Sequence, residues 1–178
     1  MILLMGIAGS GKGTQGKMLA DTRGFHLVSM GEVLRMYVTG KQRERMLAGE
    51  LLDDREIINI VDQVLASLPN GAEVLMDGFP RTIPQAEWLL EQVQAGRFGL
   101  KHSLHLVASR DAVKHRLMKR GRIDDKEASI EARFDEYERS TMPLLAWLSK
   151  HGVEVVDVEA ERSVEAVNSD LVKHLDTA

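Results

Sequence analysis

A glycine-rich segment near the amino terminus carries the residue types that bind phosphate. Residues 6–15 read GIAGSGKGTQ, with four glycines and one lysine, Lys12. Glycines let a backbone turn its N–H groups inward around phosphate oxygens, and a lysine at this offset reaches the terminal phosphates. The apolar run Met1–Met5 precedes the segment, so the pattern is strand, turn and helix, and the helix N-terminus also attracts anions. The segment predicts a nucleotide phosphate site; the alternative is an ordinary glycine-rich turn.

Asp77 is a second residue whose position suits phosphate chemistry. It follows the apolar run Val74–Met76 and precedes Gly78. In an open parallel sheet, a residue at the carboxyl end of a strand faces the edge where ligands bind. Mg²⁺ relies on one or two carboxylates together with substrate phosphates and water, so Asp77 is predicted to hold Mg²⁺ through water. The alternative is a turn, because Asp-Gly commonly forms one.

Arginines and lysines are concentrated in residues 114–122, and Arg133 follows at a distance. Guanidinium groups stay charged and bind phosphate oxygens in pairs. The structural alternatives are a solvated helix face favoured by the helix dipole, and an ion pair between Arg133 and a neighbouring acid. Binding to nucleic acid is disfavoured, because the segment has no interleaved aromatic residues and no recognised nucleic-acid motif.

Short apolar runs that alternate with longer helical patterns must position these residues. Strands are predicted over Met1–Met5, His26–Ser29, Glu73–Met76, Ser103–Val107 and Gly152–Val158. Helices are predicted over Lys12–Thr22, Gly31–Thr39, Asp54–Ser67, Pro84–Ala95, Asp111–Lys119, Lys126–Ser140, Met142–Lys150 and Ser163–Leu175. The alternation predicts an α/β fold with a five-stranded parallel sheet and helices on both faces. The roughly 43 residues between the second and third strands hold helices only, which predicts an all-helical insertion.

Composition narrows the class of protein. A chain of 178 residues predicts one domain, and 44% hydrophobic with 28% charged residues is typical of globular proteins. The absence of cysteine excludes disulfides, thiolate nucleophiles and cysteine-ligated zinc. We expect no secretory signal and no membrane span, and the net charge of −4 gives no general attraction to nucleic acid or anionic lipid. The expected location is the cytoplasm.

The phosphate loop and four further blocks, in order along the chain, resemble the adenylate kinases, within the nucleoside monophosphate kinase family. The loop has the form GKGTQ, in which Gly13 stands where the generic pattern has Ser or Thr, and Thr14 carries the hydroxyl. The other blocks are Ser29–Arg35, Gly49–Leu52, Asp77–Thr82 with Gln85, and Arg120–Asp125 with Arg133. Together they span nearly the whole chain.

The resemblance implies Mg²⁺-dependent, reversible transfer of a phosphoryl group from ATP to AMP, giving two ADP. The attacking atom would be a phosphate oxygen that is already anionic, so no general base is needed. The implied architecture is one P-loop kinase domain, residues 1–178, of three layers. It has a core of residues 1–29, 60–115 and 134–178, an acceptor-binding insertion of residues 30–59 and a short lid of residues 116–133. We expect a monomer without zinc.

The resemblance also implies roles for individual residues. Phosphoryl transfer is assigned to Lys12, Arg81, Arg120, Arg122 and Arg133. The residues implied for ATP binding are Gly9, Ser10, Gly11, Lys12, Gly13, Thr14, Arg116, Arg120 and Arg162, with Arg116 stacked on the adenine. The residues implied for AMP binding are Met30, Arg35, Glu50, Leu51, Leu52, Gly78, Phe79, Pro80, Arg81, Gln85, Arg122 and Arg133, with Arg35 and Arg81 on the phosphate.

The acceptor block departs from the family pattern at two positions. Met30 stands where adenylate kinases usually have Thr and uridylate–cytidylate kinases often have Ala, and Glu50 stands where Lys is common. Gln85 is the adenylate-type residue at a position where pyrimidine kinases tend to have Asn, and its amide can both donate to and accept from a purine. AMP is therefore the expected acceptor, and a kinase of UMP or CMP is the alternative.

The lid block is the larger departure, because only Gly121 separates Arg120 from Arg122. A lid excludes water from the reacting phosphate, so a trimmed lid predicts ATP hydrolysis without acceptor. A nucleotide-binding regulatory module with impaired catalysis is the second alternative. Asp124 and Glu127 have the spacing of a helix-capping box, although Asp124 could instead contact the ribose or the lid. A GTPase is disfavoured, because the chain has no Asn-Lys-x-Asp motif.

Overall fold

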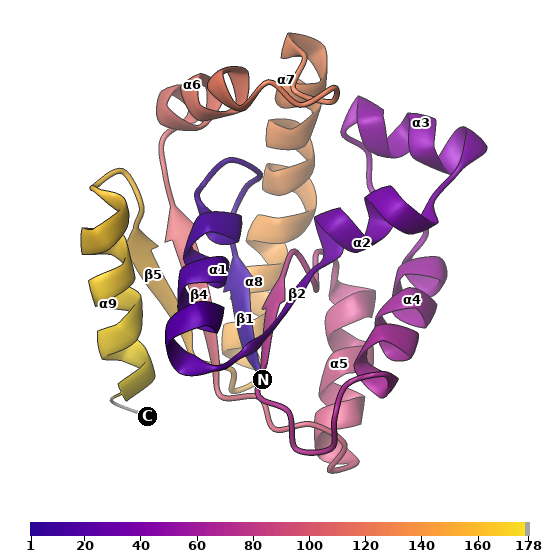
Figure 1. The fold of residues 1–178 in the computed structure, drawn as a ribbon. Coiled ribbons are helices and arrows are strands. Elements are labelled where there is room, and N and C mark those ends of the chain that lie inside the picture. Colours follow the sequence, from indigo (N-terminus) through magenta and orange to yellow (C-terminus); the bar gives the residue numbers. More distant parts are fainter. Residues whose placement is uncertain (177–178) are drawn as a thin grey trace.

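The structure is a computed structural model that describes residues 1–176. It has an α/β fold in which short strands alternate with helices (Figure 1). In chain order the elements are β1 (Ile2–Met5), α1 (Lys12–Arg23), β2 (His26–Ser29), α2 (Met30–Tyr37), α3 (Gly40–Ala48), α4 (Asp54–Ala66), β3 (Val74–Asp77), α5 (Ile83–Gln94), β4 (His102–Val107), α6 (Arg110–Arg120), α7 (Glu127–Glu136), a π-helical turn η1 (Tyr137–Thr141), α8 (Met142–Lys150), β5 (Val155–Glu159) and α9 (Val164–Asp176).

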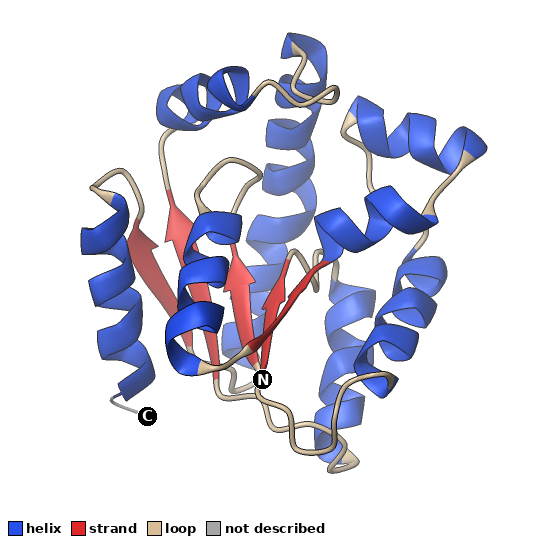
Figure 2. Cartoon of the chain, viewed as in Figure 1, coloured by secondary structure: helices blue, strands red, loops and turns tan. Residues whose placement is uncertain are grey.

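The five strands form one parallel sheet in the order β2-β3-β1-β4-β5. Of its inner strands, β1 and β3 are buried along their whole length, as expected for a parallel sheet covered on both faces. Successive residues of β1 enter different cores: Leu3 packs with α4, α5 and α8, and Leu4 packs with α1 and α9. Figure 2 shows these helices on the two sides of the sheet.

The carboxyl edge of the sheet collects the segments that follow β1 and β3. Leu4 of β1 pairs with Asp77 of β3, so the loop after β1 begins beside the end of β3. A third, smaller core joins this loop to α6 and α7; it contains Ile7, Val113, Leu117, Ile130 and Phe134. In Figure 1 these two helices lie above the edge, and α2 and α3 lie to one side of them.

The predicted α/β fold and the five-stranded parallel sheet are confirmed. The fifth strand begins at Val155 instead of Gly152, because Gly152 has a positive φ of 81° in a turn. Helix α3 was not predicted: none of its residues is buried, so it lacks the apolar period that indicates a helix. The helix predicted over residues 126–140 is α-helical over Glu127–Glu136 only; its last four residues belong to the π-helical turn, which continues directly into α8.

The capping box suggested for Asp124 and Glu127 is also wrong. Helix α7 begins after Lys126 and has no side-chain cap. Glu127 pairs instead with Lys114 of α6 at 2.7 Å, and Asp124 pairs with Arg133. The alternative, a contact of Asp124 within the lid block, is the one that the structure contains. Among residues 1–176, no helix combines the length and the apolar composition needed to cross a bilayer.

Candidate active site

A cavity of about 860 Å³ opens at the carboxyl edge of the sheet, within the size range of small-molecule sites. It is lined by the phosphate loop, the start of α2, the segment after α3, the end of β3, and parts of α6 and α7. Of the residues implied by the resemblance, it brings together Gly9, Ser10, Gly11, Lys12, Gly13, Thr14, Met30, Arg35, Glu50, Leu51, Leu52, Asp77, Gly78, Arg81, Gln85, Arg116, Arg120, Arg122, Arg133 and Arg162.

The phosphate loop holds its lysine folded back against the backbone. Lys12 Nζ donates to the carbonyl oxygens of Gly6 at 2.7 Å and Ile7 at 2.9 Å. Burial lowers the pKa of Lys12 to about 8; nearby Asp77 opposes this shift, and Arg81 and Arg120 add to it. The hydroxyl of Ser10 is buried without a hydrogen-bond partner among the described residues. The loop therefore holds a buried cation and an unsatisfied hydroxyl, both suited to phosphate oxygens.

Asp77 lies at the end of β3 and is buried. Its Oδ2 accepts a hydrogen bond from Ser29 Oγ at 3.1 Å, and its charge raises the pKa of Lys12 and Arg81. No group of three or more His, Cys, Asp or Glu residues within 1–176 is placed to hold a metal alone. A single carboxylate beside a phosphate site fits Mg²⁺, which takes most of its ligands from phosphates and water.

Arg81 and Arg35 bring positive charge to the cavity wall. Burial is the main cause of a lowered pKa at both residues. Arg122 and Arg120 lower the pKa of Arg35 further, and Arg133 and Arg35 lower the pKa of Arg81 further. Arg81 Nε donates to Gly78 O at 3.1 Å, which fixes the base of its side chain. Two partly buried guanidinium groups that line the same cavity indicate a site for an anion.

The adjacent apolar surface is formed in part by Met30, which is buried, and Leu52. Gln85 of α5 presents the polar group there, and its side chain accepts a hydrogen bond from Arg81 N at 2.8 Å. Phe79, by contrast, does not line the cavity: it is 0% exposed and packs edge-on against Trp88. Its neighbour Pro80 follows a cis peptide bond and lines a smaller pocket.

Two arginines of the lid block, Arg120 and Arg133, form ion pairs with carboxylates. Arg120 donates to both oxygens of Asp125, at 2.8 and 2.6 Å, and Arg133 donates to Asp125 at 3.1 Å and also pairs with Asp124. The side chain of Asp125 is 0% exposed. Burial alone raises its pKa, but the hydrogen bonds from Arg120, Arg122 N–H and Arg133 outweigh burial and hold the pKa below its usual range. Asp124 and Asp125 therefore hold Arg120 and Arg133 at the wall of the cavity.

Two further arginines border the cavity beside the loop between β5 and α9. Arg116 donates to Ser10 O at 3.3 Å and to Ala160 O at 2.7 Å, which ties α6 to the phosphate loop. Arg162 pairs with Glu159 at 2.8 Å and Asp170 at 2.6 Å. Arg116 is therefore bonded directly to the phosphate loop, whereas Arg162 is exposed and paired with carboxylates.

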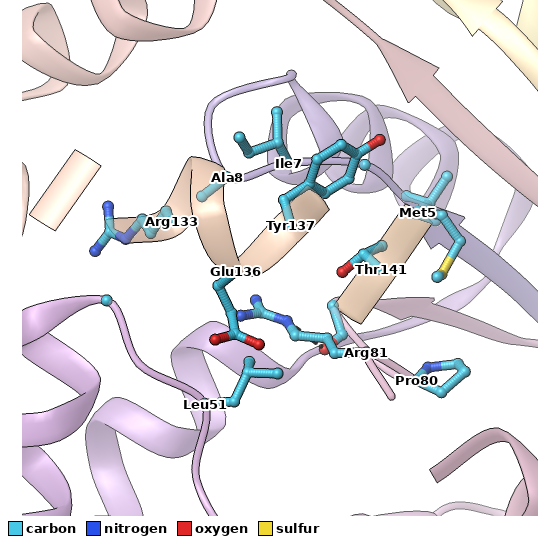
Figure 3. A pocket seen from close by; sticks show the side chains of 14 residues that line it. Met5, Ile7, Ala8, Leu51, Pro80, Arg81, Arg133, Glu136, Tyr137 and Thr141 are labelled. Carbon is cyan, nitrogen blue, oxygen red and sulfur yellow. Dashed lines mark hydrogen bonds between the residues drawn. The ribbon is translucent and has the colours of Figure 1, made fainter. Parts of the chain in front are cut away.

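A smaller pocket lies between the phosphate loop and η1. Figure 3 shows Arg81 and Glu136 facing each other there, with Arg133 pointing away from both. The carboxylate of Glu136 favours the charged form of Arg81. Arg81 thus borders both pockets, and Glu136 is a neighbour that the sequence patterns did not indicate.

Sequence reasoning also missed Asp54, at the first turn of α4. Its Oδ1 accepts hydrogen bonds from Thr82 Oγ1 at 2.7 Å and Gln85 Nε2 at 2.8 Å. Asp53 and Asp54 both read as acids at a helix start, and Asp53 is the one that caps the helix, through Arg55 N. Nothing in the local sequence distinguishes the two, because the partners of Asp54 lie 28 and 31 residues away.

The amino-acid sequence is similar to those of known proteins along most of its length. A family model described as "Adenylate kinase" matches residues 4–153. The chain is 34% identical to an adenylate kinase of Synechococcus sp. (strain CC9902) over 181 aligned residues, covering 98% of each chain. It is 34% identical to adenylate kinase isoenzyme 1 of Sus scrofa, covering 99% of this chain and 94% of the relative. A further relative, the adenylate kinase of Corynebacterium urealyticum, is 33% identical, with 98% of each chain covered.

Proposed function

From the premise that this chain belongs to the adenylate kinase family, we propose that its cavity transfers the γ-phosphoryl group of Mg²⁺-ATP to AMP, reversibly, giving two ADP. The family and its relatives make the protein a phosphotransferase of the nucleoside monophosphate kinase type with adenylate kinase function. The observation that carries the proposed chemistry is the convergence of Lys12, Arg81, Arg120 and Arg133 on one cavity beside the glycine-rich loop and Asp77.

We assign the donor nucleotide to the end of the cavity bounded by α1, α6 and the segment before α9. The backbone of residues 9–14 would bind the phosphates, with Lys12 and the unsatisfied hydroxyl of Ser10 turned toward their oxygens. Arg116 and Arg162 would border the adenosine part, and Arg120 the terminal phosphate. The positive φ of Gly9 and Gly11, 92° and 110°, supports this assignment, because it lets the loop curl around an anion.

We assign the acceptor to the end bounded by α2, α4 and the segment after β3. Arg35 and Arg81 would bind its phosphate, while Met30, Leu51 and Leu52 would contact its base. Arg122 and Arg133 would reach the bridging phosphoryl group, and Glu50 lies at the rim, where its Oε2 accepts a hydrogen bond from Arg45 Nε at 3.0 Å. Met30 offers an apolar surface to a base and no hydroxyl. Gly78 and Pro80 would shape the backbone there, while Phe79 would act from the core behind it.

Mg²⁺ fits beside Asp77, which would hold it through water while the nucleotide phosphates supply the other ligands. Bound there, Mg²⁺ would neutralise charge on the phosphates of ATP. The protein supplies the remaining positive charge from Lys12 and the arginines, and the phosphate oxygen of AMP needs no base to attack. The proposed catalytic work is therefore positioning, charge neutralisation and exclusion of water.

In this assignment the helical connection of residues 30–59 is the acceptor-binding insertion and residues 116–133 are the lid, both attached to a core of residues 1–29, 60–115 and 134–178. The third core cluster supports the lid boundary, because Leu117 and Ile130 anchor its two ends against the phosphate loop. We also propose a monomer, and the cysteine-free composition is compatible with the cytoplasm.

Turnover of AMP, UMP and CMP with Mg²⁺-ATP tests the proposal, with ADP formation followed in a coupled assay. AMP is expected to be phosphorylated far faster than UMP or CMP, and Arg81→Ala is expected to reduce kcat/KM for AMP by about 100-fold or more. Faster turnover of UMP or CMP would assign the protein to the pyrimidine kinases. Tight nucleotide binding without ADP formation would indicate a regulatory module.

A further inference from the structure

The oxygen and the nitrogen of the Gln85 side-chain amide are both hydrogen-bonded, and neither partner can switch between donor and acceptor. Its Oε1 accepts from the backbone N–H of Arg81 at 2.8 Å, and its Nε2 donates to Asp54 Oδ1 at 2.8 Å. A backbone N–H only donates, and an ionised carboxylate only accepts. A flipped amide would place two donors face to face at Arg81 and two acceptors face to face at Asp54. The oxygen and nitrogen of Gln85 therefore have fixed places.

Asp54, whose carboxylate accepts the hydrogen bond from Gln85, is itself fixed by a further contact. Asp54 Oδ1 also accepts from Thr82 Oγ1 at 2.7 Å, and Asp54 lies in the first turn of α4, where a helix favours negative charge. Thr82 in turn caps α5, the helix that carries Gln85, by accepting from Gln85 N at 3.4 Å. Asp54 thus joins the start of α4 to the start of α5 through bonds to Thr82 and Gln85.

The amide keeps one donor and one acceptor for a ligand. Gln85 has two N–H donors and an oxygen with two lone pairs, and the two bonds above use one of each. The residue is 2% exposed and contributes to the wall of the cavity, near Met30 and Leu52. A base bound there would meet one N–H of fixed position beside one oxygen of fixed position.

We propose that Asp54 is a specificity-determining positioning residue, which fixes the amide of Gln85 so that the acceptor site takes a base with an exocyclic amino group beside an unprotonated ring nitrogen. Adenine and cytosine present this pair: the amino group donates to Oε1, and the ring nitrogen accepts from Nε2. Hypoxanthine, guanine and uracil present the reverse pair, an exocyclic oxygen beside a protonated ring nitrogen. Only a flipped amide would suit them, and Asp54 and Arg81 N–H oppose the flip.

This inference rests on the proposed function, since it places the acceptor base against Gln85. It adds to that function the class of bases that the acceptor site rejects. A site built around fixed hydrogen bonds discriminates far more strongly than an apolar pocket, because a mismatched base leaves buried polar groups unpaired. Size alone would separate purines from pyrimidines but would not separate AMP from IMP.

The test compares AMP with IMP, which differ only at position 6 of the purine and in the proton on N1. For the unaltered protein, kcat/KM for AMP is expected to exceed that for IMP by about 1000-fold or more. Asp54→Asn keeps the shape of the side chain, but its amide can present either NH₂ or oxygen to Gln85. In this variant the AMP-to-IMP ratio is expected to fall at least tenfold, mainly through a gain with IMP.

Asp53→Asn is the matched control, because Asp53 is an acid at the same helix start and bonds to Arg55 N instead of Gln85. Its AMP-to-IMP ratio is expected to stay within about twofold of the unaltered protein. The ratio separates positioning from stability, since a merely destabilised α4 would reduce activity with both acceptors alike. A CMP-to-UMP ratio above one, at low absolute rates, is expected from the same rule.

An AMP-to-IMP ratio within threefold of the original in a folded Asp54→Asn variant would overturn the proposal. Should that variant not fold, comparable kcat/KM for AMP and IMP in the unaltered protein would overturn it as well. If the unaltered protein does not phosphorylate AMP at all, the proposed function itself fails. Phosphorylation of AMP with an AMP-to-IMP ratio that Asp54→Asn does not change would instead overturn only the role of Asp54.

Discussion

Arg120 donates two hydrogen bonds to the buried carboxylate of Asp125, from Nε to Oδ2 at 2.8 Å and from Nη2 to Oδ1 at 2.6 Å. Arg133 donates to the same carboxylate from α7, so Asp125 joins the two helices of the lid block. A bound phosphate would compete with Asp125 for the same guanidinium groups. The strength of this network therefore affects both the stability of the lid block and its response to a nucleotide.

Asp125→Ala should destabilise the protein by about 3 kcal/mol, because it removes the shared partner of two partly buried cations. Equilibrium urea unfolding, followed by circular dichroism, measures the change. Glu127→Gln is the control: Glu127 forms an exposed pair with Lys114, so its loss should leave the urea midpoint unchanged within error. Equal midpoints for Asp125→Ala and the unaltered protein would show that the network does not stabilise the fold.

The same carboxylate should make the stability depend on acidic pH. The pKa of Asp125 in the folded protein lies below its value of about 3.9 in an unfolded chain, so the unfolded state binds the proton more tightly. The stabilisation is complete above pH of about 4 and is lost as the pH falls through the lower, folded pKa. Urea midpoints measured between pH 7 and pH 3 should therefore fall more steeply for the unaltered protein than for Asp125→Asn. Parallel curves would contradict this assignment.

Lys12 should take up a proton when a nucleotide binds above neutral pH. Its pKa of about 8 in the free protein, lowered mainly by burial, leaves a substantial neutral fraction at pH 8.5, and phosphate charge beside Nζ favours the protonated form. Isothermal titration calorimetry of ATP binding, in buffers of different ionisation enthalpy, measures the uptake. We expect uptake at pH 8.5, little at pH 6.5, and none at either pH in Lys12→Met. Uptake that persists in Lys12→Met would assign the proton to another group.

The sequence predicted the elements whose patterns are local. The strands are short apolar runs, and the phosphate loop, Asp77 and Arg81 belong to compact motifs, so their common position at the sheet edge could be expected from a parallel topology. Helix α3 has no buried face and so lacked a pattern. The bonds of Asp54 to Gln85 and of Asp125 to Arg133 depend on packing between separate elements, which one sequence does not encode in any spacing.

Gly9→Ala should loosen the contact between the phosphate loop and α6. Gly9 has a φ of 92°, and a Cβ there would lie 2.8 Å from Leu117 Cγ. Strain and overlap together should lower the stability by about 1 to 3 kcal/mol, measured by urea unfolding. Gly13→Ala is the control in the same loop, because a Cβ on Gly13 meets no described atom within 4 Å and its backbone is helical. A larger loss of stability in Gly13→Ala than in Gly9→Ala would contradict this account.

The short connection between α6 and α7, which we propose to be part of the lid, should let water reach the phosphate of bound ATP. Helix α6 ends at Arg120 and α7 begins at Glu127, so only residues 121–126 connect them, and Arg122 of this segment is exposed. Closure of a lid over a nucleotide excludes water, and a short connection covers less of the cavity. We expect measurable release of inorganic phosphate from Mg²⁺-ATP without AMP, at a rate that falls when several residues are inserted after Gly121. Lys12→Ala, which should remove phosphate binding, serves as the background, and hydrolysis no faster than that background would refute the leak.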